Sequence, residues 1–161
     1  MVRAVKRDFL STQSWLEECA ADWGLLAREL EHHAAGAYLK RQRAALGLLA
    51  QTRGPRLAAV LTSEHHLQVR QFTSDGLRCL LIDRQSQRLV STRRYWDGRP
   101  VASQRLPEAA LVFQMVYDLQ RRRWKIERLI QTLPVPDSNV RITLSAELPG
   151  AAGRDNKAFL F

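Results

Sequence analysis

Two pairs of adjacent histidines, His32-His33 and His65-His66, are the first candidates for metal binding or proton transfer in this chain. Neighbouring residues on a helix point about 100° apart, so neither pair can offer two imidazoles to one ion on a helix. A site would need one histidine from each pair and a carboxylate, and no spacing predicts that arrangement. We therefore expect no metal and no cofactor, and interpret these histidines as surface or boundary residues.

Two aspartates, Asp83 and Asp118, each follow an apolar segment that has the character of a strand. A carboxyl group that enters a pocket from a strand can act as a general base. The alternative is an aspartate at a strand end that is solvated or paired with arginine. Arg84 and the run 121–123 are available partners. The sequence leaves both interpretations open.

Arginine and aromatic side chains gather in two short runs. They are Arg93, Arg94, Tyr95 and Trp96 in the first run, and Arg121, Arg122 and Arg123 in the second. Consecutive strand residues face opposite sides, so only some of these arginines can share a solvent face. With Tyr95 and Trp96, such a face could stack single-stranded nucleic acid, although no aromatic signature of an RNA-binding sheet is present. The two aromatic residues could equally form a protein-recognition edge or cover one end of the sheet.

The composition is that of a strongly basic globular domain. The 161 residues carry a formal net charge of +9, mostly from arginine, which favours encounters with an acidic protein, a nucleic acid or an anionic membrane surface. Cys19 and Cys79 are too few for a disulfide framework and are interpreted as free structural thiols. No segment approaches the ~20 apolar residues of a membrane span, and no apolar stretch follows the basic residues 1–8. The expected location is cytoplasmic.

The elements that would position these residues begin with helices. Apolar residues recur every three or four positions and predict a first helix over 12–34, followed by a second over 37–51. The first stripe is formed by Leu16, Cys19, Trp23, Leu26 and Leu30. Gly54-Pro55 ends the second helix and starts a short third one over 56–64.

From residue 67 the hydrophobic repeat changes from a helical period to a period of two, which is typical of strands. The predicted strands are 67–73, 77–83, 88–96, 111–118 and 123–132. Turns are expected at Ser74-Asp75-Gly76 and Asp97-Gly98, and irregular connections at 84–87 and 100–107. The fold class is therefore α+β, with N-terminal helices packed on a strongly curved antiparallel sheet.

This order of elements resembles the nuclear-transport-factor-2-like superfamily, whose cystatin-like and SnoaL-like members are cone-shaped α+β domains. The resemblance covers residues 37–133, and its sharpest part is the final hairpin, LVFQMVYD at 111–118 followed by RWKI at 123–126. Residues 58–64 look like the short helix that enters the sheet in SnoaL-like and mitochondrial-import-motor-like members. Three regions follow: a helical extension over 1–36, the cone over 37–133, and a tail over 134–161 with a possible edge strand at 140–144.

The resemblance implies a pocket inside the cone, and many such domains form homodimers through their sheets. The expected pocket lining is Phe113, Met115, Tyr117, Trp124 and Ile126. The superfamily has no shared catalytic signature, and this sequence shows no convincing inward-facing Asp/His pair. The main hypothesis is therefore a non-enzymatic binding or scaffold domain that offers an apolar pocket or a sheet surface to a protein partner or a small apolar ligand.

Two alternatives stay open at this point. One is an enzyme of the isomerase, dehydratase or cyclase kind, with His66, Asp83 or Asp118 as its base. His66 is favoured among the histidines because it directly precedes the predicted first strand, at the mouth of a cone. The other alternative is a nucleic-acid-binding module that uses an arginine-rich sheet face.

Overall fold

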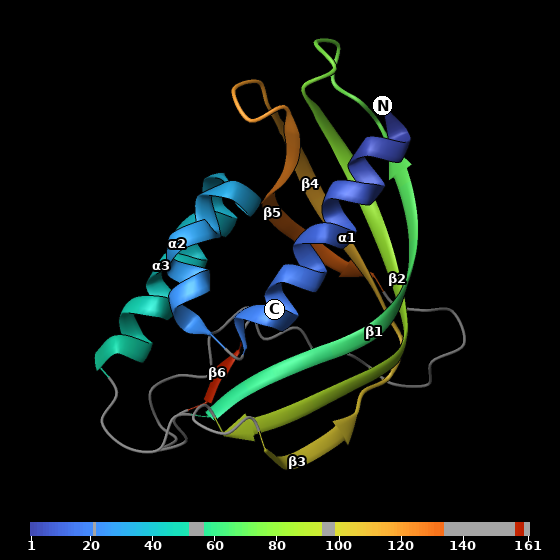
Figure 1. The fold of residues 1–161 in the computed structure, drawn as a ribbon. Coiled ribbons are helices and arrows are strands. Elements are labelled where there is room, and N and C mark those ends of the chain that lie inside the picture. The colour runs from blue at the N-terminus through green and yellow to red at the C-terminus, as the bar shows by residue number, and fades with distance from the viewer. Residues whose placement is uncertain (21, 52–56, 95–98, 134–156, 160–161) are drawn as a thin grey trace.

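The computed structural model describes residues 1–20, 22–51, 57–94, 99–133 and 157–159. Three helices come first in the chain and an antiparallel sheet follows them, so the predicted α+β class is confirmed (Figure 1). The helices are α1 (Val2–Cys19), α2 (Trp23–His33) and α3 (Gly36–Gln51). The strands are β1 (Leu57–Arg70), β2 (Arg78–Arg94), β3 (Pro100–Arg105), β4 (Ala109–Asp118), β5 (Arg123–Leu133) and β6 (Lys157–Phe159).

The long strand β2 organises the sheet, whose order is β5-β4-β2-β1-β6. On one side β2 pairs with β1 along most of its length. On the other side its first half, Arg78–Gln85, pairs with β4, and its second half, Leu89–Arg93, pairs with β3. The described part of the C-terminal tail adds β6, which runs parallel to the beginning of β1.

Irregular pairing bends the sheet. Thr62 pairs with Leu89 and Glu64 pairs with Ser86, so Ser63 alone faces two residues of β2. The β2 residues of this bulge include Gln87, whose φ of 50° is left-handed. Two further register shifts interrupt the pairing of β4 with β5. Bulges increase local bending and twist, and β1 and β2 curve around α1 (Figure 1).

Helix α1 lies across the concave face of the sheet and fills it (Figure 1). Its buried side chains recur every three or four residues, which places them on one stripe of the helix. The stripe comprises Val5, Phe9, Thr12, Leu16 and Cys19. The ring of Phe9 lies 5.1 Å from that of Phe113 on β4, measured between centroids. The core is therefore a layer between α1 and the sheet.

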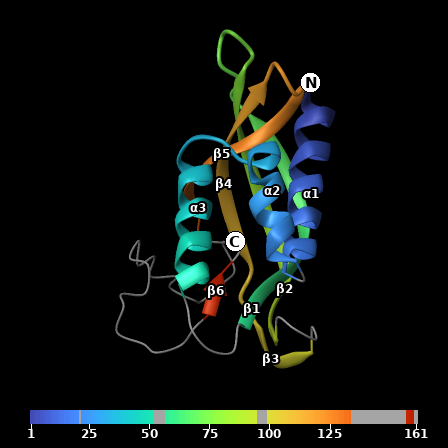
Figure 2. The same cartoon turned by 60° about the vertical axis from the view of Figure 1, so that its left-hand side comes forward.

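The connection from α2 to α3 covers the edge strand β5. The backbone N–H of Ala35 donates to the carbonyl oxygen of Ile126 over 2.9 Å, and Ala34 forms an isolated parallel bridge with the same residue. Gly36 follows with a φ of +51°, close against Glu127. Figure 2 shows α2 and α3 beside this side of the sheet. The helices thus protect an edge that would otherwise expose unpaired backbone groups.

The predicted helix over 12–34 is corrected in two ways. It begins earlier, at Val2, because Val5 and Phe9 extend the buried stripe upstream. It also divides into two helices after Cys19. Asp22, predicted to lie inside a helix, instead caps α2 by accepting hydrogen bonds from the backbone N–H groups of Gly24 and Leu25.

The prediction of a short helix over 56–64 is wrong, because residues 57–64 form the first half of β1. Their alanine and leucine content favours a helix locally, but pairing with the second half of β2 overrides that propensity. Residues 84–87, expected to be a connection, lie inside β2, and 100–105 form β3. The possible strand at 140–144 and the expected turn Asp97-Gly98 lie outside the described residues.

Candidate functional site

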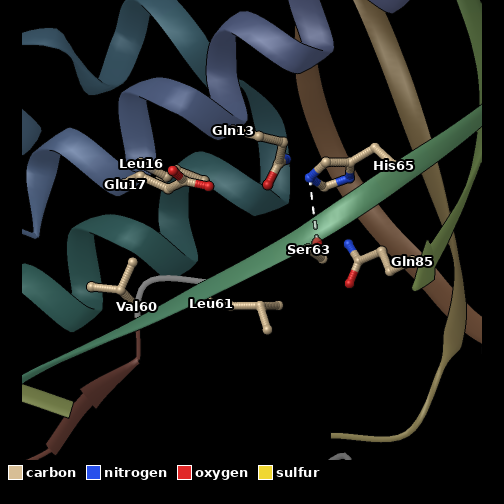
Figure 3. Close-up of a pocket in the computed structure, with 8 residues that line it drawn as sticks. All are labelled: Gln13, Leu16, Glu17, Val60, Leu61, Ser63, His65 and Gln85. Atoms are coloured by element: carbon tan, nitrogen blue, oxygen red, sulfur yellow. Dashed lines mark hydrogen bonds between the residues drawn. The ribbon is translucent and has the colours of Figure 1, made fainter. Parts of the chain in front are cut away.

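A small hollow lies between α1 and the bend of β1 (Figure 3). Its lining comes from one face of α1 and from residues of β1 and β2. The lining residues are Gln13, Leu16, Glu17, Val60, Leu61, Ser63, His65 and Gln85. Its volume of about 20 Å³ is close to the space that one water molecule needs. The hollow therefore accommodates a small group and not an enclosed substrate.

Three side chains beside this hollow form a hydrogen-bonded chain. His65 Nδ1 lies 2.8 Å from Asp83 Oδ2. His65 Nε2 lies 3.4 Å from Ser63 Oγ, and Figure 3 shows this second interaction. An ionised carboxylate can only accept, so Nδ1 carries a proton, and in the neutral imidazole Nε2 is then the acceptor. The Ser63 hydroxyl is then the donor to Nε2. This is the order of roles found in nucleophile–base–carboxylate triads.

Strand geometry explains why these groups meet. Ser63 and His65 are two residues apart on β1 and therefore point to the same face of the sheet. His65 is paired with Gln85 and lies diagonal to Asp83 on β2. The bulge opposite Ser63 bends the strand where the hydroxyl group enters the hollow. The ring of Phe9 contacts the imidazole edge-on, with 6.2 Å between centroids, and helps to orient it.

The carboxylate of Asp83 is fully buried and needs compensation for its lost hydration. Gln85 Nε2 donates to Asp83 Oδ2 over 2.7 Å, and Arg88 Nε donates to Gln85 Oε1 over 3.1 Å. Burial lowers the pKa of Arg88, and the negative charge of Asp83 opposes that shift. Asp83 Oδ1 accepts no hydrogen bond from any residue that the structure describes. A buried carboxylate thus holds the histidine, with an arginine behind it.

The sequence interpretation missed this pair. It expected no inward-facing Asp/His pair and favoured His66, whereas the structure joins Asp83 to His65. His66 is exposed on the opposite face of β1. Successive residues of a strand point to opposite faces, so only one of the two adjacent histidines can point inward. Because residues 56–64 were predicted to form a helix, the sequence did not indicate which one. Leu67 and Val69 pack against the core, which indicates that the odd-numbered residues in the second half of β1 face inward.

The other candidate base, Asp118, has a structural role at the end of β4. Its carboxylate pairs with Lys125 and accepts hydrogen bonds from the backbone N–H groups of Gln120 and Arg121 in the following turn. The hydrogen bond from Lys125 and those from the turn hold its pKa below the usual value. Of the two sequence alternatives, pairing at a strand end therefore describes Asp118, with a lysine as its partner.

The five expected pocket-lining residues belong to, or pack against, the core that α1 shares with the sheet. Phe113, Met115, Trp124 and Ile126 are buried in the core, and Tyr117 is half-buried beside it. The backbone N–H of Trp124 also donates to the carboxylate of Asp8 on α1, over 2.9 Å. The helix therefore occupies the space that the resemblance assigned to a cone interior.

A second buried polar cluster joins α1 and α2 to β5. His33 stacks on Trp15 with ring centroids 4.1 Å apart, and its Nδ1 lies 3.1 Å from Thr12 Oγ1 and 3.3 Å from an Arg123 nitrogen. Burial, followed by the charge of Arg123, lowers the pKa of His33 to about 3. His33 is therefore neutral at physiological pH and acts as a packed acceptor.

The two predicted arginine runs do not form one patch. Arg121 and Arg122 are exposed in the turn between β4 and β5, whereas Arg123 is half-buried next to His33. Arg93 and Arg94 lie near the opposite end of the 17-residue strand β2 from Arg78, which pairs beside that turn. Tyr95 and Trp96 lie outside the described residues.

A different basic surface lies on the outer face of the sheet, opposite the helices. The strand register places side chains of β1, β2, β4 and β5 in rows across this face. The rows are Arg70, Leu80, Gln114 and Arg128; Gln68, Ile82, Val112 and Gln131; and His66, Arg84, Ala110 and Leu133. Arg70, Arg84 and Arg128 are exposed, and within the described ranges none of the three pairs with a carboxylate. We call these rows the outer face.

The structure therefore defines an open α+β sheet covered by helices on one side, with a triad-like hollow on that side and a basic outer face. Neither a protein-family model nor a curated protein matches this chain. Within the described ranges, no helix has the length and apolar character that a membrane span requires. No group of three or more potential metal-ligating His, Cys, Asp or Glu side chains occurs there either.

Proposed function

We propose that this chain is a binding domain whose outer face recognises an acidic protein partner. The proposal rests on one observation: helix α1 covers one side of the sheet, and the described helices leave the other side uncovered (Figure 1). Helix α1 occupies the concave side, and the residues expected to line a pocket pack against it. An interior apolar ligand would have to displace that helix. The outer face remains as a broad surface whose arginines have no carboxylate partner among the described residues.

Charge on the outer face favours an acidic partner. Arg78 and Lys125 already pair with Glu127 and Asp118. Arg70, Arg84 and Arg128 have no such partner in the described part of the chain, and they surround half-buried aliphatic side chains of β2. Arginine binds carboxylates with two parallel hydrogen bonds, and apolar contact between such anchors is typical of a protein interface.

The side-chain types favour a protein over single-stranded nucleic acid. A nucleic-acid platform interleaves basic residues with aromatic rings on which the bases stack. In the three rows of the outer face, His66 is the single ring. The remaining residues are aliphatic, amide or arginine. Nucleic-acid binding through this face would therefore rest on charge alone.

The experiment compares two probes of equal length by fluorescence anisotropy, with NaCl raised from about 50 to about 500 mM. One probe is a labelled peptide of alternating glutamate and leucine, and the other is single-stranded oligo(dT). We expect salt-sensitive binding of the peptide that exceeds binding of the oligonucleotide. Tighter binding of oligo(dT), or no peptide binding, contradicts the proposal.

Two matched variants distinguish binding at the outer face from attraction by the net charge of the chain. The triple variant R70E/R84E/R128E should lose peptide binding, because it reverses the three cations of the outer face. The control triple variant R3E/R41E/R105E changes the same charge at exposed positions elsewhere and should retain most of the affinity. Equal losses in the two variants would show that net charge alone attracts the peptide.

The resemblance to the nuclear-transport-factor-2-like superfamily implies a homodimer that forms through the sheet. A second copy of the chain is therefore the alternative to an acidic partner on this face. Two copies of it would bring together two surfaces that both carry Arg70, Arg84 and Arg128, which is electrostatically unfavourable. We expect sedimentation velocity to give a monomer at micromolar concentration. If the unmodified chain is a dimer and R70E/R84E/R128E dissociates it, the outer face binds a second copy of the chain and not an acidic partner. The family assignment itself stays a proposal, supported by helices followed by a bent meander.

A further inference from the structure

We propose that Ser63, His65 and Asp83 form a nucleophilic site that accepts acyl groups from small activated esters. The three side chains line or adjoin one hollow in the order hydroxyl, imidazole, buried carboxylate. In the neutral imidazole, with Nδ1–H donating to Asp83, the unprotonated Nε2 faces the Ser63 hydroxyl. The site lies on the helix side of the sheet and does not depend on the proposed outer face.

The buried His33 and the half-buried His65 differ in their surroundings, and that difference identifies His65 as the base. His33 has an arginine nitrogen beside Nδ1, and its neutral form is strongly favoured. His65 instead has a carboxylate at Nδ1, which stabilises the imidazolium that forms when Nε2 takes a proton. The side chain of His65 retains 13% exposure, so the hollow reaches it. Asp83 is fully buried behind it and serves as a positioning residue.

The hollow fits the carbonyl group of a substrate whose remainder stays outside. Its volume of about 20 Å³ accepts roughly the space of one water, which a carbonyl oxygen can occupy. Gln13 reaches from α1 toward His65 (Figure 3). Its half-buried amide has no hydrogen-bond partner among the described residues. It can therefore donate to the oxygen on which negative charge develops during attack.

The steps balance with an ester and water as the reactants. Ser63 Oγ bonds to the carbonyl carbon, and its proton passes to His65 Nε2. The ester C–O bond then breaks, and the leaving alcohol takes that proton from the imidazolium. A water molecule attacks the acyl-Ser63 carbon, gives a proton to Nε2, and releases the carboxylic acid as the proton returns to Ser63 Oγ. Asp83 accepts the Nδ1–H hydrogen bond throughout.

The test labels the full-length chain with a fluorescent fluorophosphonate and locates the adduct by peptide mass spectrometry. We expect labelling at Ser63 that disappears in S63A and falls by at least about 100-fold in H65Q. Ser86 provides the matched control, because its hydroxyl lies on the paired strand and donates to Glu64. S86A should label like the unmodified chain. Hydrolysis of p-nitrophenyl acetate should follow the same pattern.

Two further measurements separate catalysis from a structural role. The labelling rate of Ser63 in H65Q should fall while the variant remains folded, and undiminished labelling in H65Q would exclude His65 as the base. In S63C, the introduced thiol should react with iodoacetamide if the hollow activates a nucleophile at this position. No adduct in the unmodified chain, an adduct on another residue, or undiminished labelling in S63A would overturn the proposal. Circular dichroism confirms that each variant is folded.

Discussion

His65 and Asp83 lie on neighbouring strands with Nδ1 and Oδ2 2.8 Å apart, and the carboxylate is fully buried. A buried charge is tolerated only when nearby donors replace its lost hydration. Gln85 supplies one donor directly, and Arg88 reaches the carboxylate through Gln85. A substitution that breaks this pair should therefore change the hollow and also lower the stability of the sheet.

Replacing Asp83 by Ala should destabilise the fold by about 3–5 kcal/mol, since removal of one partner from a buried pair leaves the other without compensation. Urea unfolding would measure this as a lower midpoint with an unchanged slope. Glu108→Ala removes an exposed carboxylate and should change the unfolding free energy by less than ~0.5 kcal/mol. A loss as small as that of the control would show that the pair is not buried.

Hydrophobic periodicity predicted the fold class, the helical character of the chain before residue 52 (as two helices, where the structure has three), and the closing hairpin with nearly its observed bounds. It failed at 56–64, where alanine and leucine favour a helix until the distant residues of β2 are available for pairing. That pairing lies about 30 residues away and leaves no local signal. The strand β3 was missed for the same reason, since its pairing depends on the free side of β2.

The site was recognised only in part for a related reason. Asp83 was a candidate, but its partner depended on which of two adjacent histidines faces inward. A shift of one residue moves every side chain of a strand to the other face, so an error in the start of β1 exchanges His65 for His66. The role of Ser63 depends on a bulge, and the pairing that creates it is set by both strands.

Phe9 should be among the most costly residues to truncate, because it joins α1 to the sheet. It is fully buried and its ring contacts Phe113 and His65. We expect Phe9→Ala to lower the free energy of unfolding by about 3–5 kcal/mol. Leu10→Ala, at the adjacent and 41% exposed position, should cost less than ~1 kcal/mol. Similar costs at the two positions would contradict the placement of α1 on the concave face.

Acid should destabilise the fold through His33. Its pKa is lowered from 6.5 to about 3 in the folded chain, so the unfolded chain binds more protons between these values. The free energy of unfolding therefore falls as the pH drops from 6.5 toward 3, by roughly a few kcal/mol. Urea midpoints at several pH values should show a shallower decline in His33→Gln than in the unmodified chain. His66→Gln removes an exposed histidine and is the matched control for the loss of one imidazole.

The two helix glycines Gly36 and Gly47 should respond to alanine with opposite signs. Gly36 has a φ of +51°, and an added Cβ would lie 2.9 Å from Glu127 Cγ, so Gly36→Ala should cost about 1–3 kcal/mol. Gly47 lies within α3 with no atom within 4 Å of an added Cβ. Gly47→Ala should stabilise the fold by roughly 0.5–1 kcal/mol, because alanine loses less backbone entropy than glycine in a helix. Thermal unfolding of both variants measures the difference. A stabilised Gly36→Ala would mean that the connection between α2 and α3 does not pass beside Glu127 in the left-handed conformation described here.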